Sequence, residues 1–231
     1  MYVTSCMKHN TIISHVAIIP DGNRRWAKEK NIPTIFGHER GYQRVRECLL
    51  LAKELGIPYV TIWAFSTENW KRESSEVNDL MDLFFKGLSI LHDDAKKEGI
   101  KVVHIGRRDR ISKKIVSLME KIEEETKKYT MFTLCIAIDY GGEDEIQRAS
   151  EKMIVNNTTS IYPFLDTSIM GLPKLDVVIR TGGEKRTSGF MPMQSLYAEW
   201  FFLEMLFPDF DSNVFKDVVQ EYFLRCRRFG K

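Results

Sequence analysis

The chain has 231 residues, 43% hydrophobic and 29% charged, a composition typical of one globular domain with a sizeable core. Its formal net charge of +2 gives no indication of a nucleic-acid partner, so a basic site must be local. Four scattered cysteines without a Cys-x-x-Cys pair argue against a disulfide framework or a zinc site. The sequence shows no signal-peptide pattern and no bilayer-length apolar run, and we expect a cytoplasmic protein that touches membranes at most peripherally.

Apolar runs that predict strands alternate with amphipathic segments that predict helices. The predicted strands are Val16–Ile19, Tyr59–Phe65, Lys101–Ile105, Met131–Ile138, Asp176–Ile179 and Glu199–Leu203, and the predicted helices are Arg24–Lys30, His38–Leu55, Glu76–Glu98, Ser112–Lys128, Glu143–Val155 and Val214–Arg227. Ile32–Gly37 and Ser66–Ser75 are expected to be loops, and 156–175 to be irregular with one short helix near Phe164. Gly99 is expected to end the third helix, and Ser112 to cap the fourth.

This alternation predicts an α/β fold. We expect residues 1–231 to form a single domain, in which a mostly parallel six-stranded sheet is flanked by helices. Residues 1–13, which precede the first strand, are expected to form a flexible arm.

The segment His15–Lys30 carries the first chemical signal. Its apolar run stops at the turn residues Pro20-Asp21-Gly22-Asn23, and a helix begins immediately after them. A strand, a turn and a helix N-terminus together favour anions, and Arg24 and Arg25 add forked donors that suit phosphate. A carboxylate at Asp21 would repel a phosphate unless a divalent cation, most commonly Mg²⁺, lay between them. Ordinary turn chemistry explains the Asp-Gly pair equally well, so the segment alone does not decide.

Four polar, glycine-rich junctions follow predicted strands and are expected to meet at the carboxyl edge of the sheet, where such sheets bind ligands. They are Pro20–Arg25, Ser66–Arg72, Asp139–Gly142 and Arg180–Gly183. The expected rim side chains are Asp21, Asn23, Arg24, Arg25, Asn69, Arg72, Arg180 and Arg186. Each arginine alone is best explained as a solvated surface group, but several guanidinium groups around one carboxylate suit two polyanions.

Several phosphate chemistries are excluded by missing motifs. The chain has neither a Gly-x-x-x-x-Gly-Lys-Ser/Thr loop nor a Gly-x-Gly-x-x-Gly turn after a strand. A carboxylate-nucleophile phosphatase stays open, although Asn23 stands where a second acid is common. Bulky apolar residues on Glu76–Glu98 and the strands are expected to form core, but a diphosphate rim that opens onto an apolar seam would also suit an isoprenoid diphosphate.

Taken together, the motifs closely resemble those of the cis-prenyltransferases, the undecaprenyl diphosphate synthase family. The matching segments are His15–Ala27 (HVAIIPDGNRRWA), Gly37-His38, Ala64–Arg72 (AFSTENWKR), Tyr140-Gly141-Gly142, Asp176–Gly183 (DVVIRTGG), Arg186–Ser188, Tyr197–Glu199, Pro208–Asp211 and Arg227–Gly230. The resemblance implies a parallel sheet with an apolar tunnel between sheet and helices, a homodimer and dependence on Mg²⁺. The implied reaction adds isopentenyl diphosphate units to an allylic prenyl diphosphate, each with a new cis double bond.

The resemblance also implies roles for individual residues. Asp21 is expected to bind Mg²⁺ and assist departure of the diphosphate, with Glu199 as a second metal-linked carboxylate. Asn69 matches the position treated as proton acceptor, but because an amide is a poor base, we expect it to orient groups while the released diphosphate takes the proton. The implied substrate-binding residues are Gly22, Asn23, Arg24, Arg25, Trp26 and His38 for the allylic diphosphate, Ser66, Thr67, Glu68, Trp70 and Arg72 in the substrate loop, and Arg180, Arg186, Thr187 and Ser188 for isopentenyl diphosphate. We also expect Phe132 to help floor the apolar tunnel.

The chain departs from the family pattern at several positions. Thr34 stands where many relatives have a phosphate-binding arginine, Lys185 replaces a histidine often linked to the metal, and Asp139 replaces a common asparagine. The segment Arg186–Pro192 looks more like archaeal members, which tend to use geranylgeranyl diphosphate as primer. A non-catalytic partner subunit of a two-protein synthase is an alternative, but such subunits lose residues that this chain keeps, among them Asp21 and Arg180.

Overall fold

The computed structural model describes residues 12–225, so the arm expected at residues 1–13 lies almost wholly outside the described part. Six strands form one sheet in the order β3-β4-β2-β1-β5-β6, and every neighbouring pair is parallel. The strands are β1 (His15–Ile19), β2 (Tyr59–Ser66), β3 (Ile100–Ile105), β4 (Phe132–Tyr140), β5 (Val177–Arg180) and β6 (Glu199–Phe202). The predicted six-stranded parallel α/β fold is therefore confirmed.

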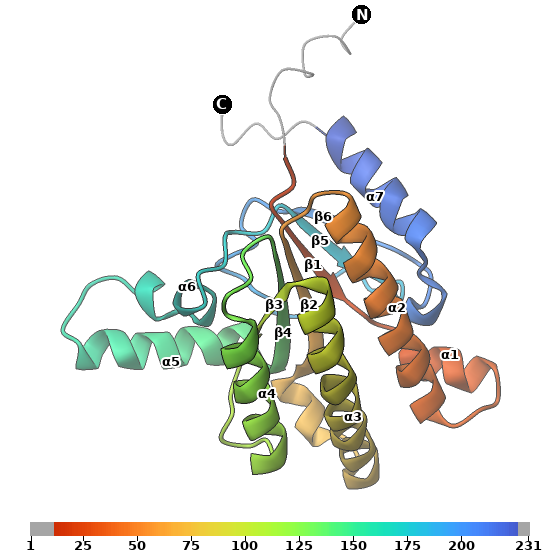
Figure 1. The fold of residues 1–231 in the computed structure, drawn as a ribbon, viewed down its shortest axis with the longest axis horizontal. Coiled ribbons are helices and arrows are strands. Elements are labelled where there is room, and N and C mark those ends of the chain that lie inside the picture. Colours follow the sequence, from red (N-terminus) through yellow and green to blue (C-terminus); the bar gives the residue numbers. More distant parts are fainter. Residues whose placement is uncertain (1–11, 226–231) are drawn as a thin grey trace, which may run out of the picture.

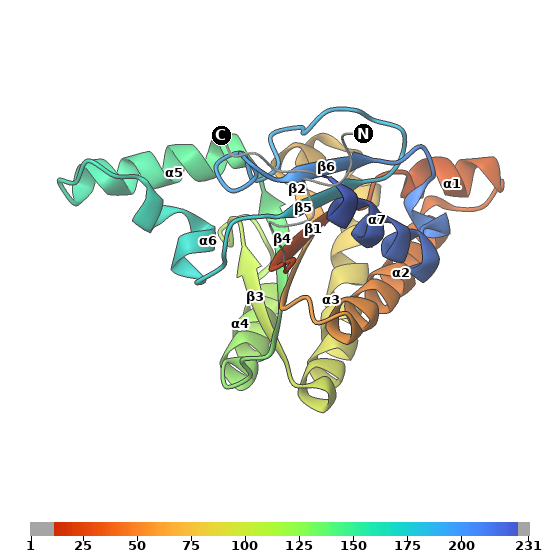
Figure 2. The ribbon, with the colours of Figure 1, turned by 90° about the horizontal axis from the view of Figure 1, so that it is seen from above.

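Helices connect consecutive strands from β1 to β5, whereas residues 181–198 join β5 to β6 without a helix. The helices are α1 (Asn23–Glu29), α2 (Thr34–Glu54), α3 (Ser74–Glu98), α4 (Lys113–Thr126), α5 (Gly142–Val155), α6 (Asp166–Ile169) and α7 (Ser212–Leu224), with short 3₁₀ helices η1 (Thr67–Lys71), η2 (Tyr162–Phe164) and η3 (Phe207–Asp209). Figures 1 and 2 show α5 and α6 together at one side, extending away from the sheet. No helix within residues 12–225 is long and apolar enough to cross a membrane.

Successive residues of β1 point to opposite faces of the sheet, and both faces are buried. Val16 and Ile18 join a large core with buried residues of α2, α3, α4 and α7. Ala17 and Ile19 join a smaller core that Phe190 and Met191, from the loop before β6, help to cover. The larger core therefore lies between the sheet and a layer of helices, which is where an apolar cavity can form.

Helix α2 begins earlier than the sequence predicts. The segment expected as a loop up to Gly37 is helical from Thr34, directly after Pro33. A Cβ atom at Gly37 would lie 2.1 Å from the Asn23 carbonyl oxygen, so this glycine permits close packing of α2 on α1. Gly99 ends α3 with a left-handed φ of 65°, as predicted, whereas Ser112 stands before α4 without a side-chain capping hydrogen bond.

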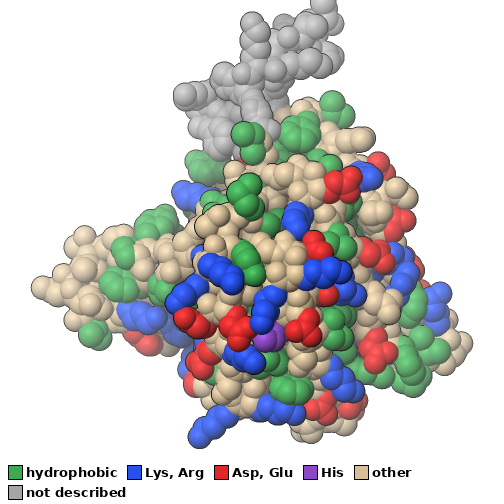
Figure 3. Space-filling view, viewed as in Figure 1, with side chains coloured by type: hydrophobic (Ala, Val, Ile, Leu, Met, Phe, Trp, Pro, Cys, Tyr) green, Lys and Arg blue, Asp and Glu red, His purple; other side chains and the backbone are tan. Residues whose placement is uncertain are grey.

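The surface carries charges of both signs. On the face seen in Figure 3, Lys and Arg side chains are interleaved with Asp and Glu side chains. Apolar side chains gather on the right of this view, over the turn between α1 and α2. Ile32 in that turn is 37% exposed, and Phe36 in the first turn of α2 is 50% exposed. Together they form an apolar spot beside the carboxyl edge of the sheet.

Candidate active site

Asp21 is fixed at the carboxyl edge of β1. Gly22 follows it with a left-handed φ of 110°, and a Cβ atom there would lie 2.8 Å from the Leu206 side chain, so glycine alone fits without a shift. The Asp21 carbonyl oxygen accepts hydrogen bonds from the Thr181 hydroxyl at 2.7 Å and from the Phe207 amide at 3.0 Å. The segments after β5 and β6 thus hold the Asp21 backbone through its carbonyl oxygen, which leaves the side-chain carboxylate to interact with other groups.

Two arginines flank the Asp21 carboxylate. Arg180 Nη2 lies 3.1 Å from Oδ2, and Arg25 Nη2 lies 3.3 Å from Oδ1. Arg180, the last residue of β5, is only 5% exposed and donates through Nη1 to the Ser188 hydroxyl at 2.8 Å. Its Nε is buried and has no partner within the described residues, which leaves a donor available for an anion.

The substrate loop, Ser66–Arg72, places its side chains by internal hydrogen bonds. It contains η1, and the Ser66 amide donates to Asn69 Oδ1 at 3.1 Å in a capping box. The amide oxygen of Asn69 is therefore engaged, and its NH₂ group is what remains for a ligand. Arg72 at the end of the loop donates to Glu76 Oε1 at 2.9 Å, and Arg24 lies 3.4 Å from the same oxygen.

His38 is held neutral between these groups. Burial, and next the positive charge of Arg72, lower the pKa of His38 from 6.5 to about 4. Its Nε2 atom is buried without a hydrogen-bond partner within the described residues. A neutral imidazole with an unpartnered nitrogen can hydrogen-bond to a ligand without adding a charge.

The four predicted junctions meet only in part. Three of them line a polar cleft made of two adjoining hollows, which share Pro20, Asp21, Asn23, His38 and Arg72. The loop-side hollow, about 440 Å³, adds Ser66, Glu68, Asn69, Arg180 and Ser188, and the α1-side hollow, about 750 Å³, adds Gly22, Arg24, Arg25, Lys28, Thr34, Glu184 and Arg186. The fourth junction turns inward, because the Asp139 side chain is fully buried and bonds to Trp70 and Arg110.

Some predicted site residues lie outside this cleft. Trp26 donates to Asp209 at 2.8 Å, and Thr187 is exposed and accepts from the Gly189 amide at 3.4 Å. Neither these two nor Thr67 and Trp70 line either hollow. The side chains of Thr67 and Trp70 instead pack the substrate loop against the residues at the end of β4. The Thr67 hydroxyl occupies the space that a Cβ of Gly141 would need, and Trp70 donates to Asp139.

Glu199 is not brought to Asp21 within this chain. It is the first residue of β6 and lies level with Val177, which itself pairs with Val16. It is therefore three residues, roughly 10 Å, toward the amino edge from the level of Ile19, where β1 ends. There its carboxylate accepts from Arg225 Nη1 at 3.2 Å. Lys185, the other residue with an expected metal link, pairs with Glu204 at 3.2 Å, and both side chains are well exposed.

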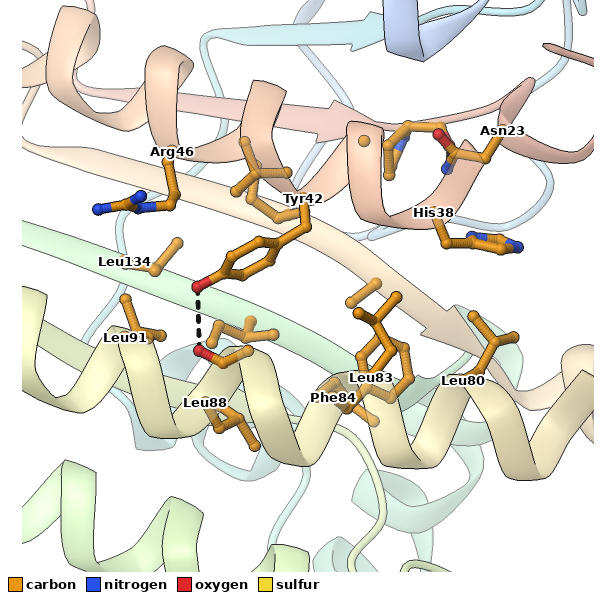
Figure 4. Close-up of a pocket in the computed structure, with 18 of the residues that line it drawn as sticks. Asn23, His38, Tyr42, Arg46, Leu80, Leu83, Phe84, Leu88, Leu91 and Leu134 are labelled. Carbon is orange, nitrogen blue, oxygen red and sulfur yellow. Dashed lines mark hydrogen bonds between the residues drawn. The ribbon is translucent and has the colours of Figure 1, made fainter. Parts of the chain in front are cut away.

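An apolar cavity of about 130 Å³ lies between α2, α3 and the sheet (Figure 4). Leu134, Ile136 and Ile138 line it from β4, and Leu83, Leu88 and Leu91 line it from α3. Figure 4 shows Asn23 and His38 at one end and Arg46 and Leu91 toward the other, with the Tyr42 hydroxyl donating across to the Gly87 carbonyl at 3.0 Å. Because Pro20, Asn23 and His38 line the cavity and both hollows, the cavity adjoins the polar cleft.

Phe132, which we expect to help floor an apolar tunnel, does not line this cavity. Phe132 is the first residue of β4, one strand in from the β3 edge of the sheet, and is only 2% exposed. It packs in the large core but is not among the residues that line the cavity. The β4 residues that do line it, Leu134 to Ile138, lie nearer the carboxyl edge.

Fold and site together define an α/β protein that can hold anions at the carboxyl edge of its sheet, beside a cavity for an apolar chain. Residues 19–230 match the sequence profile of the family described as "Putative undecaprenyl diphosphate synthase". An isoprenyl transferase of Aquifex pyrophilus is 44% identical over 223 residues, which cover 95% of this chain and 96% of that protein. An isoprenyl transferase of Agrobacterium fabrum is 42% identical over 236 residues, covering 96% of this chain and 93% of that protein.

Two solved structures share the fold. Lavandulyl diphosphate synthase from Lavandula x intermedia, in complex with dimethylallyl diphosphate, aligns with a TM-score of 0.90 and 30% identity over 95% of this chain and 98% of that one. A probable undecaprenyl diphosphate synthase from Campylobacter jejuni aligns with a TM-score of 0.83 and 29% identity over 96% and 100%. The chain belongs to the undecaprenyl diphosphate synthase family, and it is an isoprenyl transferase. The bacterial relatives give no support to the expected likeness to archaeal members.

Proposed function

We propose that this isoprenyl transferase condenses isopentenyl diphosphate units onto an allylic diphosphate primer, farnesyl or geranylgeranyl diphosphate. The product is a long polycis-polyprenyl diphosphate, the precursor of a glycosyl carrier lipid. One observation carries the proposal: a cleft with two polar hollows adjoins an apolar cavity at Pro20, Asn23 and His38. Two hollows suit two diphosphates, and the cavity suits the hydrocarbon tail of one of them.

The two diphosphates are assigned to the hollows by their donors. The α1-side hollow offers Arg24, Arg25 and the start of α1 to the allylic diphosphate, whose tail enters the cavity past His38. The loop-side hollow offers Arg180, Ser188 and Arg72 to isopentenyl diphosphate. Substrates bound in two adjoining hollows would be held close together, and this proximity would supply part of the rate enhancement.

Each addition balances without an external reagent. The allylic C–O bond breaks, and diphosphate leaves with the electron pair. The double bond of isopentenyl diphosphate then forms the new C–C bond, and loss of one proton creates the cis double bond. Negative charge grows on the leaving diphosphate, where Arg25 and the other fixed donors stabilise it.

The donor set around Asp21 fits Mg²⁺. Mg²⁺ commonly binds one or two carboxylates together with substrate phosphate oxygens. Asp21 supplies one carboxylate at the mouth of an anion-binding cleft, and residues 12–225 contain no cluster of three or more potential metal ligands that would form a closed protein site. Asp21 would hold the ion jointly with the substrate, and a bound ion supplies positive charge to the departing diphosphate.

Asn69 is proposed to orient substrate rather than to accept the proton. Its Oδ1 is engaged by the Ser66 amide, so the group left for the cleft is a donor NH₂. The released diphosphate is the better base and takes the proton. In Asn69→Asp the capping oxygen is kept while the donor becomes a charged acceptor. We expect turnover to fall by roughly a hundredfold; full activity with an unchanged pH profile would contradict the orienting role.

One assay separates the proposal from its alternatives. The purified protein is incubated with isopentenyl diphosphate, Mg²⁺ and one primer at a time, and lipid length and released diphosphate are measured. We expect long lipid and one diphosphate per unit added. A partner subunit would form no lipid alone, whereas a phosphatase would hydrolyse a simple phosphoester without isopentenyl diphosphate.

Assembly and membrane contact belong to the same proposal. We expect a homodimer that touches a membrane surface to release its product. The apolar spot formed by Ile32 and Phe36 supports the membrane contact, because exposed Lys28 and Lys30 lie beside it in sequence. This spot borders the α1-side hollow, which Ile32 also lines. Sedimentation with anionic vesicles, compared for the unmodified chain and Phe36→Ser, measures that contact.

A further inference from the structure

Asp139 carries a carboxylate that the proposed chemistry does not use. It lies near the end of β4 with a left-handed φ of 53°, and its side chain is fully buried. A buried carboxylate is costly unless it is paired and hydrogen-bonded. Asp139 is held on both sides: Arg110 Nε donates to Oδ2 at 2.9 Å and Arg110 Nη2 donates to Oδ1, while Trp70 Nε1 donates to Oδ1 at 2.8 Å.

The partners of Asp139 come from two different segments. Arg110 belongs to the loop between β3 and α4, and this loop is also tied to β4 by a 3.0 Å hydrogen bond from the Arg107 amide to the Asp139 carbonyl. Trp70 belongs to η1 in the substrate loop, and its ring packs edge-on against Phe65 at 5.1 Å. Asp139 therefore joins the substrate loop to the body of the sheet through one carboxylate.

The position of Trp70 within the loop gives this link a consequence for the site. Asn69 precedes it directly, Arg72 follows two residues later, and both line the loop-side hollow, whereas Trp70 does not. Because the Trp70 indole is hydrogen-bonded to Asp139, the loop backbone that carries Asn69 and Arg72 is held in position. We propose that Asp139, clamped by Arg110, is a positioning residue that holds Trp70 and keeps the substrate loop in its binding-competent conformation. This inference rests on the proposed function for its kinetic consequence only.

If the loop adopts its binding-competent conformation in only a fraction of the molecules, the apparent affinity for substrate falls in proportion to that fraction. Asp139→Ala removes both of the oxygens that accept hydrogen bonds from Trp70 and Arg110. Trp70→Phe keeps an aromatic ring against Phe65 and removes only the N–H donor. For each variant we expect the KM for isopentenyl diphosphate to rise by roughly tenfold, with kcat at saturation within about twofold. In the double variant, KM is expected to rise no further than in the more strongly affected single variant, because both substitutions break the same link.

A second readout needs no activity. Trypsin cleaves after Lys71 and Arg72, directly beyond Trp70, and cleavage without substrate is followed by mass spectrometry. We expect faster cleavage there in Asp139→Ala and Trp70→Phe. The matched control is Arg108→Met: Arg108 lies on the same loop as Arg110 but pairs with Glu123 at 2.8 Å. It is expected to change neither cleavage nor KM.

The outcomes are distinguishable. Unchanged cleavage at Lys71 and Arg72 in both variants would overturn the inference whether or not the protein proves to be a prenyltransferase. A lower melting temperature with unchanged KM and cleavage would overturn it too, because it would reduce Asp139 to a structural role. Faster cleavage in a protein that makes no lipid would uphold the link and reject only the proposed function.

Discussion

The polar cleft and the apolar cavity lie side by side but are built differently. The cleft is made mainly from loops at strand ends, where hydrogen bonds hold Asp21 and Asn69 in place. Arg180 and His38 each keep a buried polar atom without a partner among residues 12–225. The cavity is made from the middle of α2, α3, β2 and β4, with almost wholly apolar walls. A substitution in the cleft should therefore change the rate of the chemistry, and one in the cavity should change which chain length fits.

The largest effect is expected from Asp21→Ala. Removing the carboxylate takes away the proposed metal ligand, and we expect turnover to fall on the order of a thousandfold. Arg25 and Arg180 lose their negative partner but remain, so primer binding should survive. Steady-state turnover and a primer titration measure the two effects separately.

The matched control for this variant is Glu204→Gln. Glu204 is a nearby carboxylate that is 75% exposed, pairs with Lys185, and lines neither hollow of the cleft. Its turnover should stay within about threefold of the unmodified chain. Loss of primer binding in Asp21→Ala with intact chemistry at saturation would contradict the role given to Asp21.

His38 stands where the two regions meet, and pH tests its neutrality. Burial lowers the pKa values of His38, His15 and His104 to about 4 from 6.5. Between pH 6.5 and 4 the unfolded chain thus binds more protons than the folded one, and the free energy of unfolding falls as pH falls. From pH 6.5 to 5 each histidine should cost up to about 2 kcal/mol.

Denaturant unfolding at pH 7 and pH 5 measures this loss. In His38→Gln the dependence on pH should be weaker by about one histidine's share. An unchanged dependence in that variant would show that His38 is not held neutral by the fold.

The sequence predicted the parts of this molecule that follow from periodicity and topology. Alternating apolar runs and helical stripes gave the sheet, and the carboxyl-edge rule brought Asp21, Asn69 and Arg180 together. The positions of Asp139 and Glu199 depend on features that periodicity does not encode. Asp139 turns inward with a left-handed backbone, and the register of β6 against β5 sets Glu199 near the amino edge.

The sequence also did not predict which residues form the cavity wall. Phe132, Leu134, Ile136 and Ile138 alternate identically along β4, so periodicity places them on one face without telling which of them faces packed core and which faces open space. The role of Gly37 could not be predicted from the sequence either, because this glycine permits close helix packing and does not form a turn.

An effect of intermediate size is expected from a substitution in the cavity wall, and it tests whether this wall limits product length. Leu134→Phe adds volume to a wall residue, and we expect products shorter by at least one isoprene unit with the rate of the first condensation nearly unchanged. The matched control is Phe132→Leu, a substitution two residues earlier on the same face and outside the lining. It should lower stability by about 1–3 kcal/mol without changing product length. Equal shortening in both variants would mean that general loosening, and not the cavity wall, sets the length.

The smallest effect is expected at a polar contact between α2 and α3 beside the cavity. The Tyr42 hydroxyl donates to the Gly87 carbonyl at 3.0 Å and so joins α2 to α3 (Figure 4). Tyr42→Phe keeps the ring and removes the hydrogen bond, and the free energy of unfolding should fall by about 1 kcal/mol. Because Tyr42 lines the cavity and neither hollow of the cleft, kcat should not change. Product length should shift toward longer chains if the two helices can separate further. A large loss of kcat would show that the cavity and the cleft are coupled, and that their separate construction does not keep their functions apart.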